Sequence, residues 1–190
     1  MFMQHKTSDI IYLFNVTFSR VYNTRLIKGE GEPIYIPKSK SCSYHQIVFA
    51  HGYFSSALHE ISHWCQAGDK RRLLEDYGYW YTPDGRNEEQ QIAFEQVEVI
   101  PQAIEWAFHV ACGKKFNVSI DNLSGTETDS SPFKTKVYNQ VLSYLSNGFP
   151  KRASEFIQAL ADFYHVDFPL SRDQFVQNNP SIVEHLHVKI

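Results

Sequence analysis

Apolar side chains recur at helical spacing in several segments of the chain, and this pattern predicts amphipathic helices with one face in a core. Outside the middle of the chain, these segments are residues 9–23 with Ser8 or Asp9 as a cap, residues near 134–147, residues 150–165 beginning at Pro150, and short helical turns in the tail from Phe168.

Extended segments are few and short. After a turn at residues 29–33, apolar, β-branched and aromatic residues predict strands at residues 34–36 and 47–49. Residues 77–81 alternate like a strand and lead into a Pro-Asp-Gly turn at residues 83–85. The pattern therefore predicts a small sheet.

Another helix is predicted in the middle of the chain, from about residue 55 to residue 67. Ser55 or Ser56 is expected to cap this helix, and Gly68 to end it after Ala67. Its core-facing stripe consists of Leu58, Ile61 and Cys65.

A second long helix is expected to begin after Asn87. Asn87 is a favourable cap, and Glu88 and Glu89 in the first turn suit the positive end of the helix dipole. Pro101 is expected to kink this helix or make it restart. Residues from about 112 to 132 are rich in Gly, Ser, Asn and Thr and predict a long surface loop.

The predicted fold class is α+β. We expect residues 1–190 to form a single, mainly helical domain, with a small sheet beside the helix of the middle segment. The tail from about residue 168 carries the weakest pattern.

Composition narrows the function classes. A hydrophobic content of 43% and a charged content of 21% are typical of a globular protein. The net charge of −3 argues against direct nucleic-acid binding. There is neither a secretory signal pattern nor a run of about 18 apolar residues, so no membrane partner is expected and the expected location is cytoplasmic. The three cysteines lack Cys-x-x-Cys spacing.

The run His-Glu-Ile-Ser-His in the middle segment is the most informative motif. On a helix, His59 and His63 lie one turn apart on one face, where both imidazoles can bind one divalent metal. Glu60 lies beside them on the neighbouring strip. The alternative is an ordinary helix with unrelated surface or core histidines. Because the two histidines border the core-facing stripe, we favour a metal site.

Catalytic metal sites usually take a third protein ligand and leave positions open. The second long helix carries a polar stripe at helical spacing, made of Gln91, Glu95, Glu98, Gln102 and Glu105. As a whole, the stripe is interpreted as a solvated face. Glu98 is the preferred third ligand because Val97 and Val99 flank it in the most apolar stretch, where a charge needs a partner. Glu95 is the alternative.

Several longer runs resemble the elongation factor P hydroxylase family. The resemblance extends from about residue 10 to residue 165. The runs are FAHGYFSSALHEISHWC (49–65), DYGYWYTPDGR (76–86), FEQVEVIPQAIEW (94–106) and NTRLIKGEGEPIY (23–35).

The resemblance implies an enzyme that hydroxylates a lysine at a loop tip of elongation factor P, after that lysine has received a β-lysyl group. It implies a zincin-like metal site formed by His59, His63 and a glutamate placed at Glu98. Hydroxylation of a C–H bond needs a redox-active metal, so Fe(II) is the expected metal and dioxygen the co-substrate. Glu60 is the catalytic candidate and would orient the ligands or move protons.

Two other functions fit the motif alone. A zinc metallopeptidase would use Glu60 as the general base that activates a metal-bound water. A binding module would keep the metal only for structure.

Overall fold

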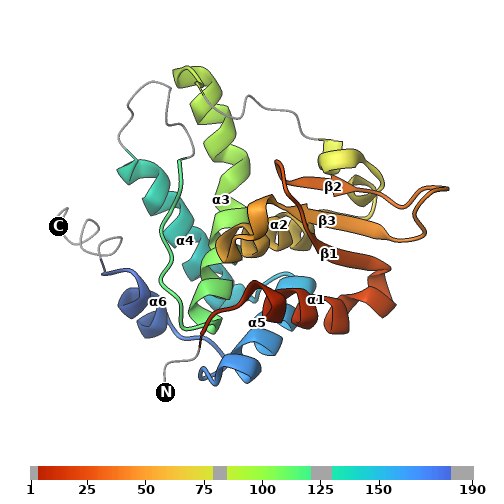
Figure 1. Ribbon diagram of the computed structural model, residues 1–190. Helices are drawn as coiled ribbons and strands as arrows, with labels where there is room; N and C mark the ends of the chain where they lie inside the picture. The colour runs from red at the N-terminus through yellow and green to blue at the C-terminus, as the bar shows by residue number, and fades with distance from the viewer. Residues whose placement is uncertain (1–3, 79–84, 121–129, 181–190) are drawn as a thin grey trace.

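A long helix, α3 (Glu88–Ala111), runs through the computed structural model, which describes residues 4–78, 85–120 and 130–180 (Figure 1). Helices α2, α4 and α5 all pack against α3. In chain order, the other elements are α1 (Thr7–Tyr22), β1 (Thr24–Lys28), β2 (Ile34–Ile36), β3 (His45–Phe49), α2 (Phe54–Gln66), α4 (Ser131–Asn147), α5 (Lys151–Tyr164) and α6 (Arg172–Asn178), with 3₁₀ turns at Ala50–Gly52, Arg71–Leu73 and Glu75–Gly78.

The sheet has the order β1-β3-β2, with β1 parallel and β2 antiparallel to the central strand β3. Helix α1 packs on β1, and α2 packs on β3. The predictions at residues 34–36 and 47–49 are confirmed, but β1 was not predicted. The fold class is thus α+β and mainly helical, with the small sheet beside the expected helix.

The predicted helices are confirmed, but two of their caps are not. Lys6 precedes α1 in the N-cap position, and Tyr53 precedes α2; neither side chain caps its helix. Helix α2 begins before the two serines, and the Ser56 hydroxyl instead accepts a hydrogen bond from the backbone N–H of Ala50 at 3.0 Å. This bond holds the turn that leads into α2.

Helix α3 confirms its predicted start. The side chain of Asn87 accepts from the backbone N–H of Gln90, and the Gln90 side chain accepts from the backbone N–H of Asn87. The predicted restart at Pro101 is wrong, because α3 is continuous through that buried residue. Every residue from Pro101 to Ala111 is buried, and this packing offsets the backbone hydrogen bond that proline cannot make.

The predicted strand at residues 77–81 is wrong where the structure describes it. Asp76 and Tyr77 have φ values of 45° and 57°, which a strand cannot contain. The Tyr77 ring instead stacks on that of Tyr35, with centroids 4.4 Å apart. Its aromatic character therefore serves packing rather than a pleated strand. Residues 79–84, with most of the predicted turn, lie outside the described residues.

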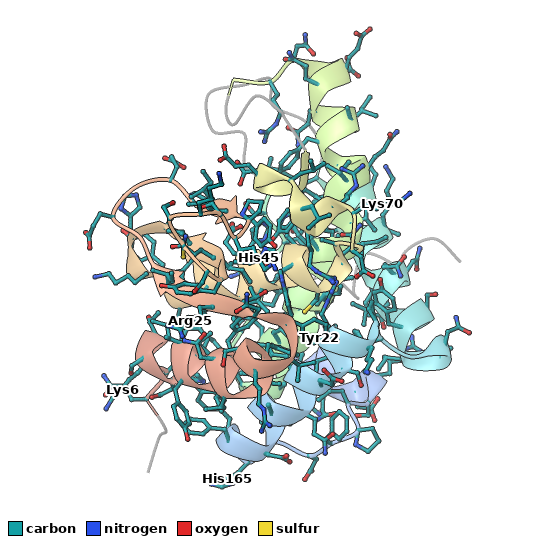
Figure 2. All side chains as sticks on the ribbon, turned by 90° about the vertical axis from the view of Figure 1, so that its right-hand side faces the viewer. Lys6, Tyr22, Arg25, His45, Lys70 and His165 are labelled. Carbon is teal, nitrogen blue, oxygen red and sulfur yellow. The ribbon has the colours of Figure 1, made fainter. Side chains whose placement is uncertain are left out.

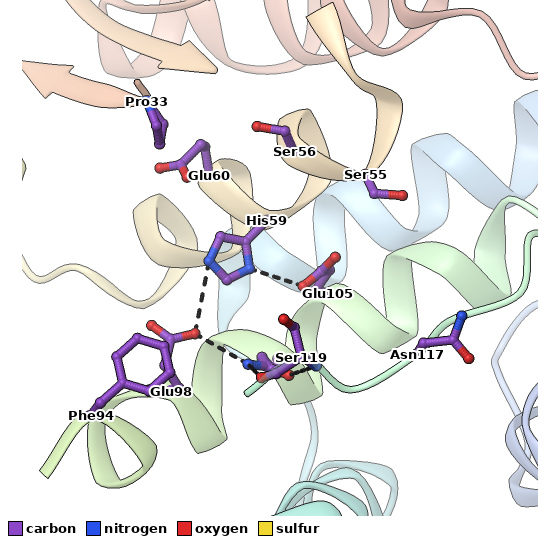
Figure 3. A pocket seen from close by; sticks show the side chains of 11 residues that line it. Pro33, Ser55, Ser56, His59, Glu60, Phe94, Glu98, Glu105, Asn117 and Ser119 are labelled. Carbon is purple, nitrogen blue, oxygen red and sulfur yellow. Dashed lines mark hydrogen bonds and ion pairs between the residues drawn. The ribbon is translucent and has the colours of Figure 1, made fainter. Parts of the chain in front are cut away.

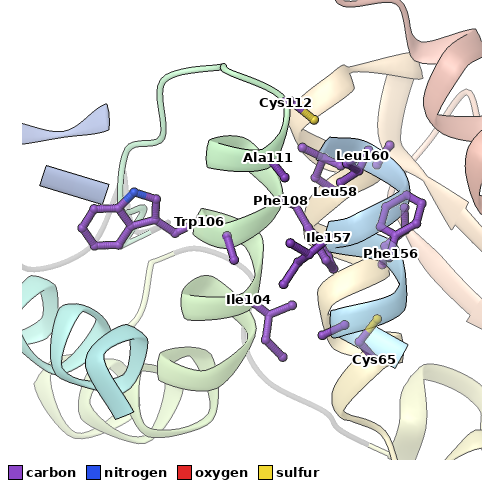
Figure 4. Close-up of a cluster of buried hydrophobic side chains, with 14 of the residues drawn as sticks. Leu58, Cys65, Ile104, Trp106, Phe108, Ala111, Cys112, Phe156, Ile157 and Leu160 are labelled. Carbon is purple, nitrogen blue, oxygen red and sulfur yellow. The ribbon is translucent and has the colours of Figure 1, made fainter. Parts of the chain in front are cut away.

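A central part of the hydrophobic core lies where α2, α3 and α5 meet (Figure 4). Leu58 of α2, Phe108 of α3, and Phe156 and Leu160 of α5 are all fully buried there. Charged side chains such as those of Lys6, Arg25 and Lys70 lie on the exposed surface (Figure 2). This packing fixes α2 against α3, which sets the geometry between the two helices that carry the candidate ligands.

We expect Leu160→Ala to lower the free energy of unfolding by about 2–5 kcal/mol, because it leaves a cavity in this core. Chemical denaturation monitored by circular dichroism measures the change. The control is Leu73→Ala, at a side chain that is 66% exposed, which should change stability by less than about 0.5 kcal/mol. Equal losses in the two variants would contradict the assigned core.

Candidate metal centre

The structure brings the three predicted ligands together. The Nε2 atoms of His59 and His63, both on α2, lie 3.1 Å apart. Glu98 of α3 faces them, with Oε1 at 3.2 Å from His63 Nε2 and Oε2 at 3.7 Å from His59 Nε2. Figure 3 shows His59 between Glu98 and Glu105. Within the described ranges, these three residues form the one group of His, Cys, Asp and Glu side chains able to hold a metal ion.

The spacing of these atoms fits a bound cation. Donor atoms that lie about 2.1 Å from one ion at angles of about 90–110° are about 3.0–3.4 Å from each other. The distances of 3.1 Å and 3.2 Å fall in this range, and the distance of 3.7 Å corresponds to a wider angle. Glu98 is only 1% exposed, and Oε1 accepts no hydrogen bond from any described residue. Burial alone would raise the pKa of Glu98, but the charges of His63 and His59 lower it. The site therefore presents an ionised carboxylate and two imidazoles, a donor set suited to a divalent metal.

Glu105 contacts His59 on the side of the ring that faces away from the other two ligands. The Nδ1 atom of His59 lies 2.9 Å from Oε2 of Glu105, which leaves Nε2 facing His63 and Glu98. Burial alone would lower the pKa of His59, but Glu105, together with Glu98, raises it. Metal-binding histidines commonly donate their second N–H to a carboxylate in this way. Sequence reasoning assigned no such role to Glu105, although its spacing of seven from Glu98 placed both on one face of α3.

The sequence suggested that the polar stripe on α3 is a solvated face, and this interpretation is wrong. Four of its five members are buried. The two glutamines among them form hydrogen bonds to the segment that follows α3. Gln102 donates to the carbonyl of Ser119 and accepts from its N–H, at 2.7 Å and 3.0 Å. Gln91 donates to the carbonyl of Ile120. The remaining member, Glu95, lies outside the three-ligand group and accepts a long hydrogen bond from Gln91.

Other histidines stand apart from the three-ligand group. His45 bonds to Tyr35 through Nδ1. His109, which has no ligand spacing, faces Glu105. The His-x-His pair at residues 185 and 187 lies outside the described residues.

A cavity of about 330 Å³ opens beside the three-ligand group. Its wall includes His59, Glu60, Glu98 and Glu105, and none of the described residues lining it is Lys or Arg. Glu60 lines this space outside the three-ligand group, and its side chain lies beside Pro33 (Figure 3). Burial raises the pKa of Glu60, and a cation beside it would favour its ionised form. Because carboxylic side chains line the cavity, it is suited to a cationic group.

The chain is similar to known proteins over most of its length. The family model described as Elongation factor P hydroxylase matches residues 13–175, which extends past the resemblance seen in the sequence and into α6. A Haemophilus influenzae protein named Elongation factor P lysine hydroxylase is 51% identical over 173 residues, covering 91% of this chain and 97% of that protein. No helix within the described ranges is both long and apolar enough to cross a membrane.

We expect Glu98→Gln to weaken metal binding more than about 100-fold, because losing a ligand should exceed the effect of losing an outer partner. Anaerobic Fe(II) titration against a competing chelator measures the affinity. Glu95→Gln, one turn earlier on α3, is the matched control and should bind as the unchanged protein does. If Glu95→Gln lost the metal and Glu98→Gln kept it, the choice of third ligand would be wrong.

Proposed function

The chain belongs to the elongation factor P hydroxylase family, and on that premise we propose that it hydroxylates the β-lysylated lysine at a loop tip of elongation factor P. The supporting observation is the convergence of His59, His63 and Glu98 on one point beside a cavity. The proposed resident metal is Fe(II), held by these three residues, and dioxygen is the proposed co-substrate.

Two histidines and one carboxylate are the ligand set of non-haem iron oxygenases. Bound iron would supply the redox capability that zinc lacks. The reaction consumes R–H, O₂, two electrons and two protons, and gives R–OH and H₂O. The protein's own part is to hold the ligands through the α2–α3 packing and the Glu105 hydrogen bond, and to enclose the substrate side chain.

The cavity supports a cationic substrate. A β-lysylated lysine presents ammonium groups, and carboxylates in a poorly hydrated space attract them strongly. Glu60 lines the cavity outside the three-ligand group, so we assign it to binding such an ammonium group. Glu105 is already engaged by His59. This assignment differs from that of a zinc peptidase, in which the same glutamate would activate water.

We predict that the Fe(II)-loaded protein, supplied with a chemical reductant and ¹⁸O₂, adds one labelled oxygen atom to β-lysylated elongation factor P. Intact-mass and fragment mass spectrometry locate the atom. His63→Ala is the control and should give no product. Cleavage of the factor, or full turnover without oxygen, would contradict hydroxylation and favour the peptidase.

We also predict that Glu60→Gln keeps its metal and raises KM for the modified factor about tenfold, with a smaller change in kcat, because a charged hydrogen bond to substrate is lost. Steady-state kinetics and metal analysis test this. The control is Glu155→Gln on α5, away from the cavity. A collapse of kcat at unchanged KM would instead assign Glu60 to the chemical step.

A further inference from the structure

We propose that His109 is a positioning residue of the metal centre and acts on His59 through Glu105. The inference rests on the metal centre of the proposed function, but it concerns a residue outside the ligand set. His109 lies in the last turn of α3 and is 3% exposed.

A continuous chain of contacts links His109 to the ligands. Glu105 Oε2 lies 2.9 Å from His59 Nδ1, and Glu105 Oε1 lies 3.5 Å from His109 Nε2. On its other side, His109 Nδ1 lies 3.0 Å from the carbonyl oxygen of Lys115. Glu105 therefore sits between two imidazoles, one of which belongs to the candidate ligand set.

The hydrogen-bonding partners assign the role of each nitrogen of His109. A carbonyl oxygen only accepts hydrogen bonds, so Nδ1 must donate its proton to Lys115. Nε2 then faces a carboxylate, and that approach is favourable only when Nε2 also carries a proton.

Glu105 needs such a partner on this side. Its carboxylate is almost fully buried, and a buried charge is costly unless it is paired. Pairing with His109 compensates the charge and holds the carboxylate in the rotamer that reaches His59. The ring of Phe116, 5.5 Å from that of His109, packs beside it. His59 is thereby kept with Nδ1 protonated and Nε2 free for a metal.

Two substitutions separate this role from a structural one. His109→Gln places an amide near the former Nε2 and can still donate to Glu105, but it loses the Lys115 contact. His109→Asn places an amide near the former Nδ1 and can still donate to Lys115, but it loses Glu105. Both remove the imidazole, so they are matched controls for each other.

The experiment measures two quantities on the full-length protein: affinity for Co(II), used as the probe by its visible absorption, and the melting temperature without metal. We expect His109→Asn to bind Co(II) about tenfold more weakly, as expected for loss of an outer-shell partner, and His109→Gln to bind within about threefold of the unchanged protein. The melting temperature should fall in both variants, because His109→Asn loses the pairing with Glu105 and His109→Gln loses the bond to Lys115. Equal Co(II) affinities in the two variants would overturn the proposal.

A Glu105→Gln background adds a second test. If His109 acts through Glu105, adding His109→Asn there should weaken Co(II) binding by less than twofold. A full additional tenfold loss would show that His109 acts by another route and would overturn the inference. Absence of Co(II) binding by the unchanged protein would instead overturn the metal centre itself, so the two failures are distinguishable.

Discussion

The structure depends on one electrostatic constraint. Three groups that all carry lone pairs, the Nε2 atoms of His59 and His63 and the carboxylate of Glu98, point at one another inside the protein. Without a proton or a cation between them, such an arrangement is repulsive, and the charge of Glu98, which is 1% exposed, is left without compensation. The rest of the fold is organised to hold it, because α2 and α3 can bring these atoms together only while their packed faces stay in register.

The polar face of α3 helps to fix the positions of the three ligands. Its amides bind the backbone at Ser119 and Ile120, so the chain after the helix becomes a wall of the cavity. Its second carboxylate, Glu105, orients His59. Buried hydrogen bonds such as these hold the groups that they join in a fixed position. Ligand placement and cavity shape are therefore controlled by the same helix face.

Local signals predicted much of this structure from the sequence. The cap at Asn87, the start at Pro150 and the spacing of His59 and His63 depend on neighbouring residues, and the structure agrees with each. The burial of the polar stripe and the role of Glu105 could not be predicted from the sequence. They depend on which face of α3 packs against α2, and on how residues 114–120 fold back along α3. The alternating pattern that begins at Tyr77 led to a wrong strand prediction for a similar reason, because the Tyr77 ring packs on Tyr35, which is distant in the sequence.

The central claim is that one iron ion occupies the point shared by His59, His63 and Glu98. Anomalous X-ray diffraction at the iron edge, from crystals of the Fe(II)-loaded protein grown without oxygen, tests it most directly. The predicted result is a single strong peak bounded by the two Nε2 atoms and the Glu98 carboxylate, with His59 Nδ1 still bonded to Glu105. A peak elsewhere, or no peak at this point in crystals proven to contain iron, would contradict it.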